Sequence, residues 1–341
     1  MTIIVPAYGP IDASIVFIGE APGRDEVEYG RPFVGASGKL LRVICTSAGI
    51  SLSECYLTNV IKEKPPSNNI KKFIDLTKKT PVITPEYTAY EDSLYKELLS
   101  LESVKVLVPV GNTALYATTR KFGKGNGITA WRGSILTTTI RGKEFKVVPT
   151  LHPAALLPGR GNYTMRYPVI HDLTRIKYQS EFSGIRGEKS RLIIEPTYLQ
   201  VCHHLGMLRA QKRVYFDIEI YNQEVSCISF ACKGYDSISI PFITEGRNYF
   251  TAEDETTIWK DIGGILEDEK IMKVAQNSAF DADFLFSKYG IATLPLGDTM
   301  IQHSILYPDL PRSLAFLTSI YTEQPYYKNI GQKIFAEGSS K

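Results

Sequence analysis

Two acidic residues stand two positions apart in the apolar stretch Tyr215-Phe-Asp-Ile-Glu-Ile220. Side chains alternate between the two faces of a strand, so Asp217 and Glu219 are expected to project from one face. A third acid, Asp281, follows in Asn277-Ser-Ala-Phe-Asp281, just after another expected strand. An isolated pair of this kind usually belongs to a solvated surface. The added Asn-x-x-x-Asp spacing instead predicts that Asp217, Glu219 and Asp281 gather around a divalent metal ion.

A second candidate site begins with a glycine-rich loop, residues 19–41, between an apolar strand and a helix. Its small residues and backbone amides allow a ligand to come close. The spacing alone fits a nucleotide-binding loop and a purely structural turn equally well.

Three further side chains could complete this site: Phe33, Asn59 and His152. Each also has a structural interpretation, as a core aromatic, a strand-end cap and a loop histidine held by hydrogen bonds. Only their order and spacing together favour a functional site.

The loop sequence Gly19-Glu-Ala-Pro-Gly-Arg-Asp-Glu-Val-Glu-Tyr-Gly-Arg-Pro-Phe-Val-Gly-Ala-Ser-Gly-Lys-Leu-Leu41 resembles the first motif of the family 4 uracil-DNA glycosylases. The resemblance continues at Thr58-Asn-Val60 with Pro65-Pro66, at Trp131-Arg-Gly133 and at Leu151-His-Pro153. It implies a three-layer α/β domain with a central parallel sheet, and excision of uracil or a related base that is flipped out of DNA.

The same resemblance implies a role for each residue. Phe33 would stack on the base, Asn59 would pair with its edge, and His152 would donate a hydrogen bond to the developing anionic oxygen. Glu20 and Glu26 would position or activate water, and the loop from Pro153 to Arg160 would enter the DNA groove. The remaining base-binding residues would be Ala21, Pro22 and Gly23.

The chain differs from this family in the cysteines that bind a metal cluster. Family 4 enzymes carry an iron–sulfur cluster on four cysteines, whereas this chain has no cysteine before Cys45, and Glu63 stands where the family has a cysteine after Thr-Asn-Val. We therefore expect no iron–sulfur cluster.

The acidic residues resemble the first two motifs of the DEDD 3′→5′ exonucleases found in family A DNA polymerases, especially phage members. The resemblance extends to Asp298-Thr-Met300 and to residues 306–321. It implies a ribonuclease H-like mixed α/β domain and Mg²⁺ or Mn²⁺ at Asp217, Glu219 and Asp281. Asp298 also fits a helix N-cap.

The family's fourth carboxylate, in a Tyr-x-x-x-Asp motif, has no match between Leu285 and Lys341. We therefore expect an incomplete exonuclease domain that stops before its third motif and is inactive as it stands, because loss of one ligand usually disables a two-metal site. The hypothesis is an amino-terminal fragment of a phage DNA polymerase, with the remaining polymerase polypeptide as a partner.

The elements that must position the first site alternate between strands and helices. Strands are expected at 14–18, 56–61, 104–110 and 146–150, and helices at 36–49, 85–101, from 112 and at 167–181. This alternation predicts a largely parallel sheet whose ligands gather at the carboxyl ends of the strands.

Residues 182–190 are polar, contain glycine and lack periodicity, which predicts a linker between domains at 1–181 and 191–341. Strands at 213–220, 225–233 and 237–242, then a helix at 253–266 and a strand at 271–275, predict a mixed α/β second domain.

Composition sets broad limits. The chain has 341 residues, 43% of them hydrophobic, which suffices for two cores. It shows no long apolar run, so we expect no membrane association and a cytoplasmic location, in the host cell if the chain is phage-encoded. Its five cysteines lack C-x-x-C spacing and are expected to be reduced. Residues 1–185 carry a net charge of +7 and residues 186–341 one of −4, which weakly favours DNA binding by the first half.

The sequence therefore predicts a DNA-processing enzyme, a DNA glycosylase joined to an exonuclease-like domain, with DNA as its partner. Two alternatives stay open. The first domain could be a non-catalytic reader of uracil or modified bases, or a DNA-docking platform for a split polymerase. Alternatively, the chain could be a structural fragment with both sites inactive.

Overall fold

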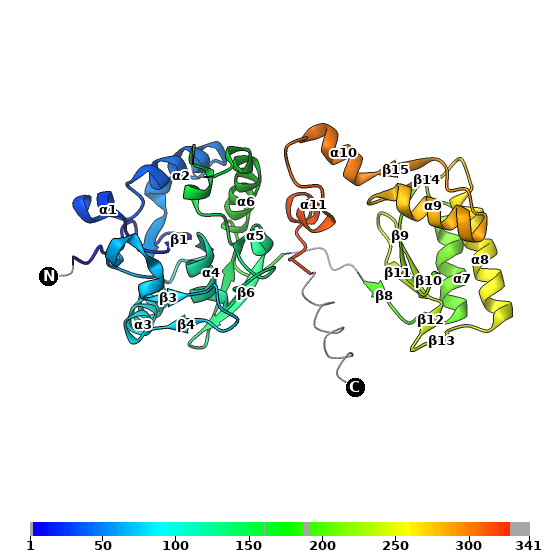
Figure 1. Cartoon of the computed structure of the whole chain (residues 1–341), viewed down its shortest axis with the longest axis horizontal. Coiled ribbons are helices and arrows are strands. Elements are labelled where there is room, and N and C mark those ends of the chain that lie inside the picture. The colour runs from blue at the N-terminus through cyan, green and yellow to red at the C-terminus, as the bar shows by residue number, and fades with distance from the viewer. Residues whose placement is uncertain (1–2, 160, 187–190, 328–341) are drawn as a thin grey trace. The chain divides into compact units, whose positions relative to one another are not determined.

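The computed structural model describes residues 3–159, 161–186 and 191–327. The chain divides into two compact units, one formed by residues 1–187 with 315–341 and the other by residues 188–314. Each unit has a sheet and a hydrophobic core of its own (Figure 1).

The first unit is built on a five-stranded sheet with the order β2-β1-β5-β7-β6. All neighbours are parallel except β6 and β7, which form an antiparallel hairpin at one edge. The strands are β1 (Ile15–Gly19), β2 (Tyr56–Asn59), β5 (Val106–Pro109), β6 (Leu136–Ile140) and β7 (Lys143–Val147). A separate two-stranded ribbon consists of β3 (Ile74–Asp75) and β4 (Val82–Ile83).

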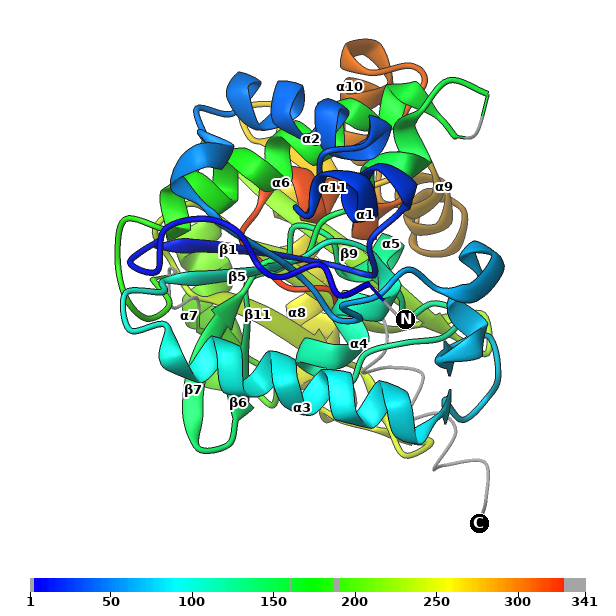
Figure 2. The same ribbon diagram turned by 90° about the vertical axis from the view of Figure 1, so that its left-hand side faces the viewer.

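Six helices accompany this sheet: α1 (Arg24–Tyr29), α2 (Ala36–Ser47), α3 (Pro85–Ser100), α4 (Asn112–Thr119), α5 (Ile128–Trp131) and α6 (Arg166–Gln179). Alternate residues of β1 enter opposite cores, because successive side chains of a strand point to opposite faces. Ile15 and Phe17 pack with α2 and α6, and Val16 and Ile18 pack with α3 and α4. Figure 2 shows the resulting three layers, with α2 and α6 above the strands and α3 and α4 below.

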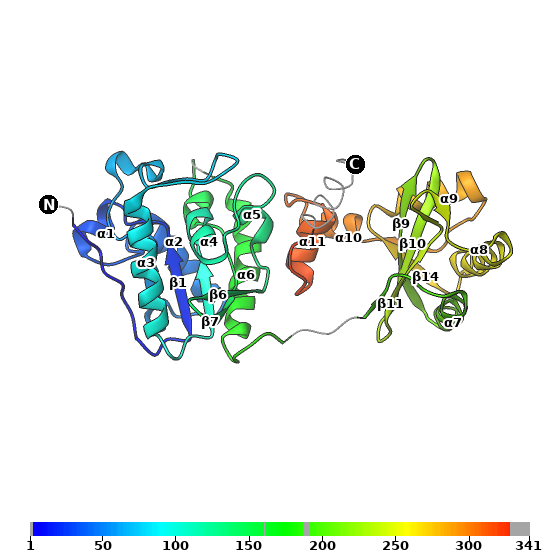
Figure 3. The ribbon, with the colours of Figure 1, turned by 90° about the horizontal axis from the view of Figure 1, so that it is seen from below.

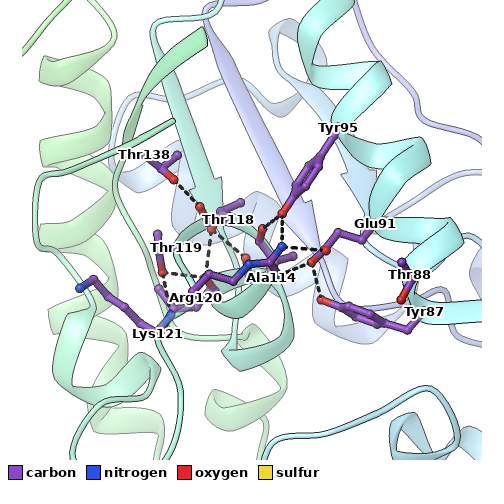
Figure 4. Close-up of polar contacts among 12 residues, drawn as sticks. Tyr87, Thr88, Glu91, Tyr95, Ala114, Thr118, Thr119, Arg120, Lys121 and Thr138 are labelled. Carbon is purple, nitrogen blue, oxygen red and sulfur yellow. Dashed lines mark hydrogen bonds and ion pairs between the residues drawn. The ribbon is translucent and has the colours of Figure 1, made fainter. Parts of the chain in front are cut away.

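A polar network joins two of these layers (Figure 4). The guanidinium of Arg120, at the end of α4, donates to both carboxylate oxygens of Glu91 on α3, at 2.5 and 2.8 Å, and to the hydroxyl of Tyr95 at 2.9 Å. Tyr95 in turn donates to the carbonyl of Ala117 at 2.6 Å. The network fixes α4 against α3, and the first residue of α4 borders the candidate site.

The second unit contains a mixed six-stranded sheet with the order β15-β14-β9-β10-β11-β8. Its strands are β8 (Leu192–Ile193), β9 (Arg213–Tyr221), β10 (Glu224–Ala231), β11 (Ser237–Pro241), β14 (Met272–Ala275) and β15 (Leu296–Asp298), beside a small ribbon of β12 (Ile243–Thr244) and β13 (Arg247–Asn248). Its helices are α7 (Tyr198–Leu208), α8 (Ala252–Leu266), α9 (Ser278–Tyr289) and α10 (Thr299–Leu306). Figure 3 shows α7 and α8 side by side against this sheet.

The structure confirms the α/β class and the alternating order of the first half, with small shifts of boundaries. The strand expected at 146–150 is β7 (Lys143–Val147), paired with the unforeseen β6, and Thr150 forms only an isolated bridge with Val110. The glycine-rich loop contains the short helix α1, which the sequence pattern did not predict.

The domain boundaries also differ from the expected ones. Phe182 is buried, and the ammonium of Lys146 donates to the carbonyls of Phe182 and Gly184, so the start of the expected linker is fixed to the first unit. Residues 187–190 lie outside the described residues. Helix α11 (Leu314–Tyr321) and the residues up to 327 pack on the first unit, although the expected second domain runs from 191 to 341.

Among the described residues, none of the helices is both long and apolar enough to cross a lipid bilayer.

Candidate active site

A cavity of about 530 Å³ opens in the first unit where four parallel strands end. Glu20 follows β1, Asn59 is the last residue of β2, Gly111 follows β5, and His152 lies five residues beyond β7. Ligands of parallel α/β sheets gather at this edge, because the loops after neighbouring strands converge there. Every glycosylase-site residue predicted from the sequence lines this cavity: Glu20, Ala21, Pro22, Gly23, Glu26, Phe33, Asn59 and His152.

Asn59 lies against one wall of the cavity and is 5% exposed. No side-chain hydrogen bond links it to another described residue, so its amide retains both a donor and an acceptor for a ligand. A β-carbon on Gly19 would lie 2.2 Å from the amide oxygen of Asn59 and 2.9 Å from Cζ of Phe33. The absence of a side chain at position 19 therefore allows Asn59 and Phe33 to occupy their places.

Phe33 is buried beside Asn59 and has a positive φ of 55°. This left-handed conformation is costly for a residue with a bulky side chain and persists only where the surroundings enforce it. Gly38 makes room for this conformation, because a β-carbon there would lie 2.0 Å from the carbonyl oxygen of Phe33. The loop thus directs an aromatic ring into the cavity at a cost in backbone strain.

Glu26 holds the glycine-rich loop together. One carboxylate oxygen accepts the backbone N–H of Gly23 at 3.0 Å, and the other accepts that of Gly35 at 2.8 Å. Glu26 also lies in the first turn of α1, where a negative charge is favourable. Because both oxygens are engaged, this geometry favours a structural role for Glu26.

Glu20 has a different environment. One of its carboxylate oxygens accepts the hydroxyl of Thr113 at 2.6 Å, and Thr113 is in the first turn of α4. The side chain is only partly buried and lines the cavity. Of the two carboxylates predicted to handle water, Glu20 is the one with an oxygen that accepts no hydrogen bond from the described residues.

His152 caps the short 3-10 helix η4 (Pro153–Leu156). Its Nδ1 accepts the backbone N–H of Ala154 at 3.2 Å, so the proton of the neutral ring is on Nε2. Burial lowers the pKa of His152 below the ordinary 6.5, against the opposing effect of Glu20 and Glu26. The site therefore contains a neutral imidazole that can donate one hydrogen bond from Nε2.

A buried ion pair fixes the loop that carries His152. The guanidinium of Arg132 binds both carboxylate oxygens of Asp172, at 3.0 Å through Nε and also through an Nη atom. Thr150 donates to the same carboxylate at 2.9 Å. The motif Trp131-Arg-Gly133 thus supports the cavity indirectly, through the ion pair of Arg132 with Asp172. No feature of the sequence predicted Asp172 as this partner.

The four-cysteine iron–sulfur cluster of the family 4 enzymes does not fit the donors of this unit. Cys45 and Cys55 are its two cysteines, and both are buried in the apolar core. Burial raises the pKa of Cys55 to about 12, whereas cluster ligands are thiolates. Cys55 precedes β2 and Glu63 follows that strand; burial and the nearby Glu63 raise the pKa of Tyr90 to about 12.

The acidic site of the second unit is less complete. Asp217 and Glu219 lie on the exposed face of β9, and Asp281 on α9 accepts the backbone N–H of Ile218 at 3.2 Å. Burial, together with the charges of Asp281 and Glu219, raises the pKa of Asp217 to about 6. Within the described ranges, however, no three acidic, cysteine or histidine side chains are grouped closely enough to hold a metal ion. The predicted Mg²⁺ or Mn²⁺ site therefore stays a prediction.

Asp298 has the structural role that its position suggested. Its carboxylate accepts the backbone N–H groups of Met300 and Ile301 as the N-cap of α10. It also accepts those of Asn277 and Ser278 at 3.2 and 2.8 Å, and thereby holds the turn that leads into α9 and Asp281.

The fold and the cavity define an α/β protein with a ligand site at the carboxyl edge of a parallel sheet. Residues 6–174 match the family model of the uracil DNA glycosylase superfamily. Residues 202–334 match the model of a 3′–5′ exonuclease.

Similar curated proteins are type-4 uracil-DNA glycosylases. The one from Thermotoga maritima is 36% identical over 176 residues, which are 52% of this chain and 82% of that protein. The one from Archaeoglobus fulgidus is 37% identical over 154 residues, 45% of this chain and 71% of that protein. The chain belongs to the uracil DNA glycosylase superfamily, and a 3′–5′ exonuclease domain follows its glycosylase-family domain.

Solved structures similar to the chain include Escherichia coli RNase D, with a TM-score of 0.32 and 18% identity, and the EXO domain of Aedes aegypti Nibbler, with a TM-score of 0.34 and 14% identity. The first match covers 42% of this chain and 36% of RNase D, and the second covers 44% and 77%. The chain thus spans about a third of the length of RNase D.

Proposed function

We propose that the first unit excises uracil from DNA by hydrolysis of the N-glycosidic bond, with the flipped base held in the cavity at the strand ends. The observation that carries the proposal is the meeting of Phe33, Asn59, His152 and Glu20 around one cavity. The curated type-4 relatives add support, because they are named as uracil-DNA glycosylases.

Recognition of the base follows from hydrogen-bonding chemistry. The edge of uracil offers an N–H donor beside a carbonyl acceptor, and the amide of Asn59 offers the complementary acceptor and donor. Cytosine presents the opposite pattern at the same two positions. The ring of Phe33 supplies a face for stacking, which flipped bases commonly find in such enzymes.

Bond cleavage requires stabilisation of the departing base. When the bond between C1′ and N1 breaks, its electron pair stays with uracil, and negative charge accumulates on a carbonyl oxygen. The Nε2–H of His152 would donate to that oxygen without transferring its proton. A neutral donor suits this role because its orientation is fixed in advance by the bond from Ala154 to Nδ1.

Water completes the reaction. Its oxygen bonds to C1′ and one of its protons passes to a carboxylate, for which Glu20 is the candidate, before reaching the base. Thr113 would orient this carboxylate through its 2.6 Å hydrogen bond. Glu26 would act indirectly, by holding the loop that carries Phe33.

Contact with the DNA groove is assigned to the loop after His152. Pro153 and Leu156 of η4 are buried, so the residues beyond them are the ones available to enter the duplex. Arg160, the last residue of the predicted loop, lies outside the described residues.

For the second unit we propose a role beside the glycosylase in DNA processing, which its match to the 3′–5′ exonuclease family model supports. The connection to a phage DNA polymerase, and a partner polymerase polypeptide, rest on the motif resemblance alone.

The test uses the whole chain and an end-labelled duplex with a single uracil, in the presence of EDTA. Alkali-labile sites should form with the wild type and fall by a factor of about 10² or more with Asn59→Ala. Uracil-dependent DNA binding without strand breaks after alkali would contradict excision and favour the non-catalytic reader.

A further inference from the structure

Residues 315–327 pack on a different unit from the one that their sequence predicts. The 3′–5′ exonuclease family match includes them, since it runs from 202 to 334. In the structure they nevertheless belong to the compact unit formed by residues 1–187. The glycosylase-family unit thus receives a helix, α11, from sequence of the other family.

Two buried apolar side chains of α11 and one aromatic contact form the first part of this attachment. Leu317 and Ile320, three residues apart on α11, are 5% and 6% exposed. Tyr326 packs against the core that α2 and α6 share, and its ring meets that of Trp131 edge-on at a centroid distance of 5.4 Å. Edge-to-face pairs of this kind add to the stabilisation that burial provides.

Arg175 on α6 forms the second part. Its guanidinium donates to the carbonyls of Ser319 at 3.1 Å and Thr322 at 2.6 Å, and reaches that of Ile320 at 3.5 Å. The last carbonyls of a helix have no partner within the helix and carry its negative dipole end, so a cation there is favourable. Arg175 also donates to the carbonyl of Gly133, so its guanidinium group bridges α11 and the Trp131-Arg-Gly133 motif.

Two further hydrogen bonds fix the register of the segment. An Nη atom of Arg132 donates to the hydroxyl of Ser319 at 2.8 Å, and the backbone N–H of Tyr326 donates to the hydroxyl of Ser134 at 3.1 Å. Arg132 is itself 1% exposed and anchored by Asp172. The guanidinium of Arg132 is therefore held in place before the segment binds, which lowers the entropy lost on binding.

We propose that Trp131, Arg132, Ser134 and Arg175 form a docking site for a short amphipathic helix that is followed by the exposed residues 322–325 and a tyrosine. Its occupant is the segment 315–327 of this chain. The exonuclease-family unit is then connected to the glycosylase-family unit at both of its ends. One connection is the covalent chain at residues 187–190, and the other is the docked segment 315–327.

The site is also next to the base pocket. Ile128 and Thr129 line the cavity, and Trp131 of the same short helix, α5, contacts Tyr326. Occupation of the docking site thus holds one end of a helix whose other end borders the pocket.

The experiment cuts the full chain within the connection. A protease recognition sequence replaces residues 187–190, and the cleaved protein is analysed by size-exclusion chromatography with light scattering. The wild-type pieces should elute together with 1:1 stoichiometry. The double variant Leu317→Asp/Ile320→Asp should separate into two species, whereas Ile305→Asp, at a 76% exposed position of α10, should not.

Hydrogen exchange on the uncut protein gives an independent measurement. Amides of residues 318–322 should be protected in the wild type and in Lys177→Ala, an exposed cation on the same helix as Arg175. They should exchange at least tenfold faster in Arg175→Ala. Separation of the wild-type pieces after cleavage, co-elution that survives Leu317→Asp/Ile320→Asp, or unchanged exchange in Arg175→Ala would each overturn the proposal. None of these readouts depends on excision of uracil.

Discussion

At the scale of single residues, the amide of Asn59 carries the proposed specificity. It is buried at the cavity wall, without a hydrogen-bond partner among the described side chains, and it can satisfy a donor and an acceptor at once. A site built to pair with a polar edge discriminates strongly, because the wrong base leaves buried groups unpaired.

Replacement of Asn59 by aspartate tests this pairing at constant shape. An ionised carboxylate accepts hydrogen bonds but cannot donate, so the carbonyl of uracil would face an acceptor. The single-turnover rate of uracil excision should fall by a factor of about 10² or more, while the melting temperature changes little. Equal rates for Asn59→Asp and the wild type would show that Asn59 does not pair with the base.

His152 predicts a particular pH dependence. In the neutral ring the proton on Nε2 donates to the base, and burial lowers the pKa of His152 in the folded protein below 6.5. The excision rate should therefore be flat above pH 6.5 and should fall as the pH drops through the lowered pKa. The stability contributed by the neutral ring follows the same direction, complete above 6.5 and lost at lower pH.

A matched variant, His152→Gln, keeps a donor but does not titrate in this range. It should be slower by a factor of about 10²–10³ and should lose the acidic limb of the wild-type profile. A wild-type profile that declines between pH 6.5 and 8, or an acidic limb unchanged in His152→Gln, would contradict a neutral donor at this position.

At the scale of elements, the site depends on how closely β1 and β2 approach at their carboxyl ends. Gly19 pairs with Asn59 in the parallel ladder, and the amide of Asn59 and the ring of Phe33 fill the space above it. The loop between β1 and α2 is then held by Glu26, which bridges Gly23 and Gly35.

Gly19→Ala should therefore damage the pocket without touching DNA. The added carbon would lie 2.2 Å from the Asn59 oxygen, so this side chain and Phe33 must move. Excision should fall at least tenfold and stability by about 1–3 kcal/mol, the usual cost of overpacking. Gly206→Ala, with nothing within 4 Å of the new carbon, is the control: it should leave excision unchanged and, inside helix α7, raise stability by about 0.5–1 kcal/mol. Unimpaired excision by Gly19→Ala would mean that this packing does not position the base.

The sequence was sufficient for the parallel strands and for the pocket, because a strand, a loop and a polar residue recur in order along the first half. Buried strands such as Val106–Pro109 can be predicted from their apolar composition. The residues that follow parallel strands then lie together at the carboxyl edge of the sheet. The β6–β7 hairpin was missed because β6 consists of three consecutive threonines between Leu136 and Ile140, two of them exposed, and so lacks a clear apolar pattern.

Other features depend on contacts between distant positions, which spacing does not reveal. The role of Glu26 depends on two backbone amides, one of them nine residues away. Asp172 meets Arg132 across 40 residues, and Arg175 meets Ser319 across 144. For the same reason the sequence assigned residues 315–327 to the second domain.

At the scale of the whole molecule, the two families contribute separate chemistry. The cavity residues all come from the first unit, and the acidic residues Asp217, Glu219 and Asp281 all come from the second. The only described elements that depart from this division are α11 and the residues that follow it.

The double variant Asp217→Asn/Asp281→Asn should therefore excise uracil at the wild-type rate. Burial raises the pKa of both acids, and the charge of Asp281 adds to the effect on Asp217, so their replacement by neutral amides should leave the second unit at least as stable as before. The measurements are single-turnover excision and thermal unfolding. A tenfold loss of excision would show that the acidic cluster and the base pocket act together.

Identification of the product by mass spectrometry shows directly whether this pocket excises uracil. The full chain is incubated in EDTA with two duplexes of the same sequence, one with a single uracil and the other with thymine in its place. We expect free uracil and an abasic strand from the first duplex, and no released base from the second. Intact strands from both, or a reaction abolished by EDTA, would contradict a metal-independent uracil excision in this pocket.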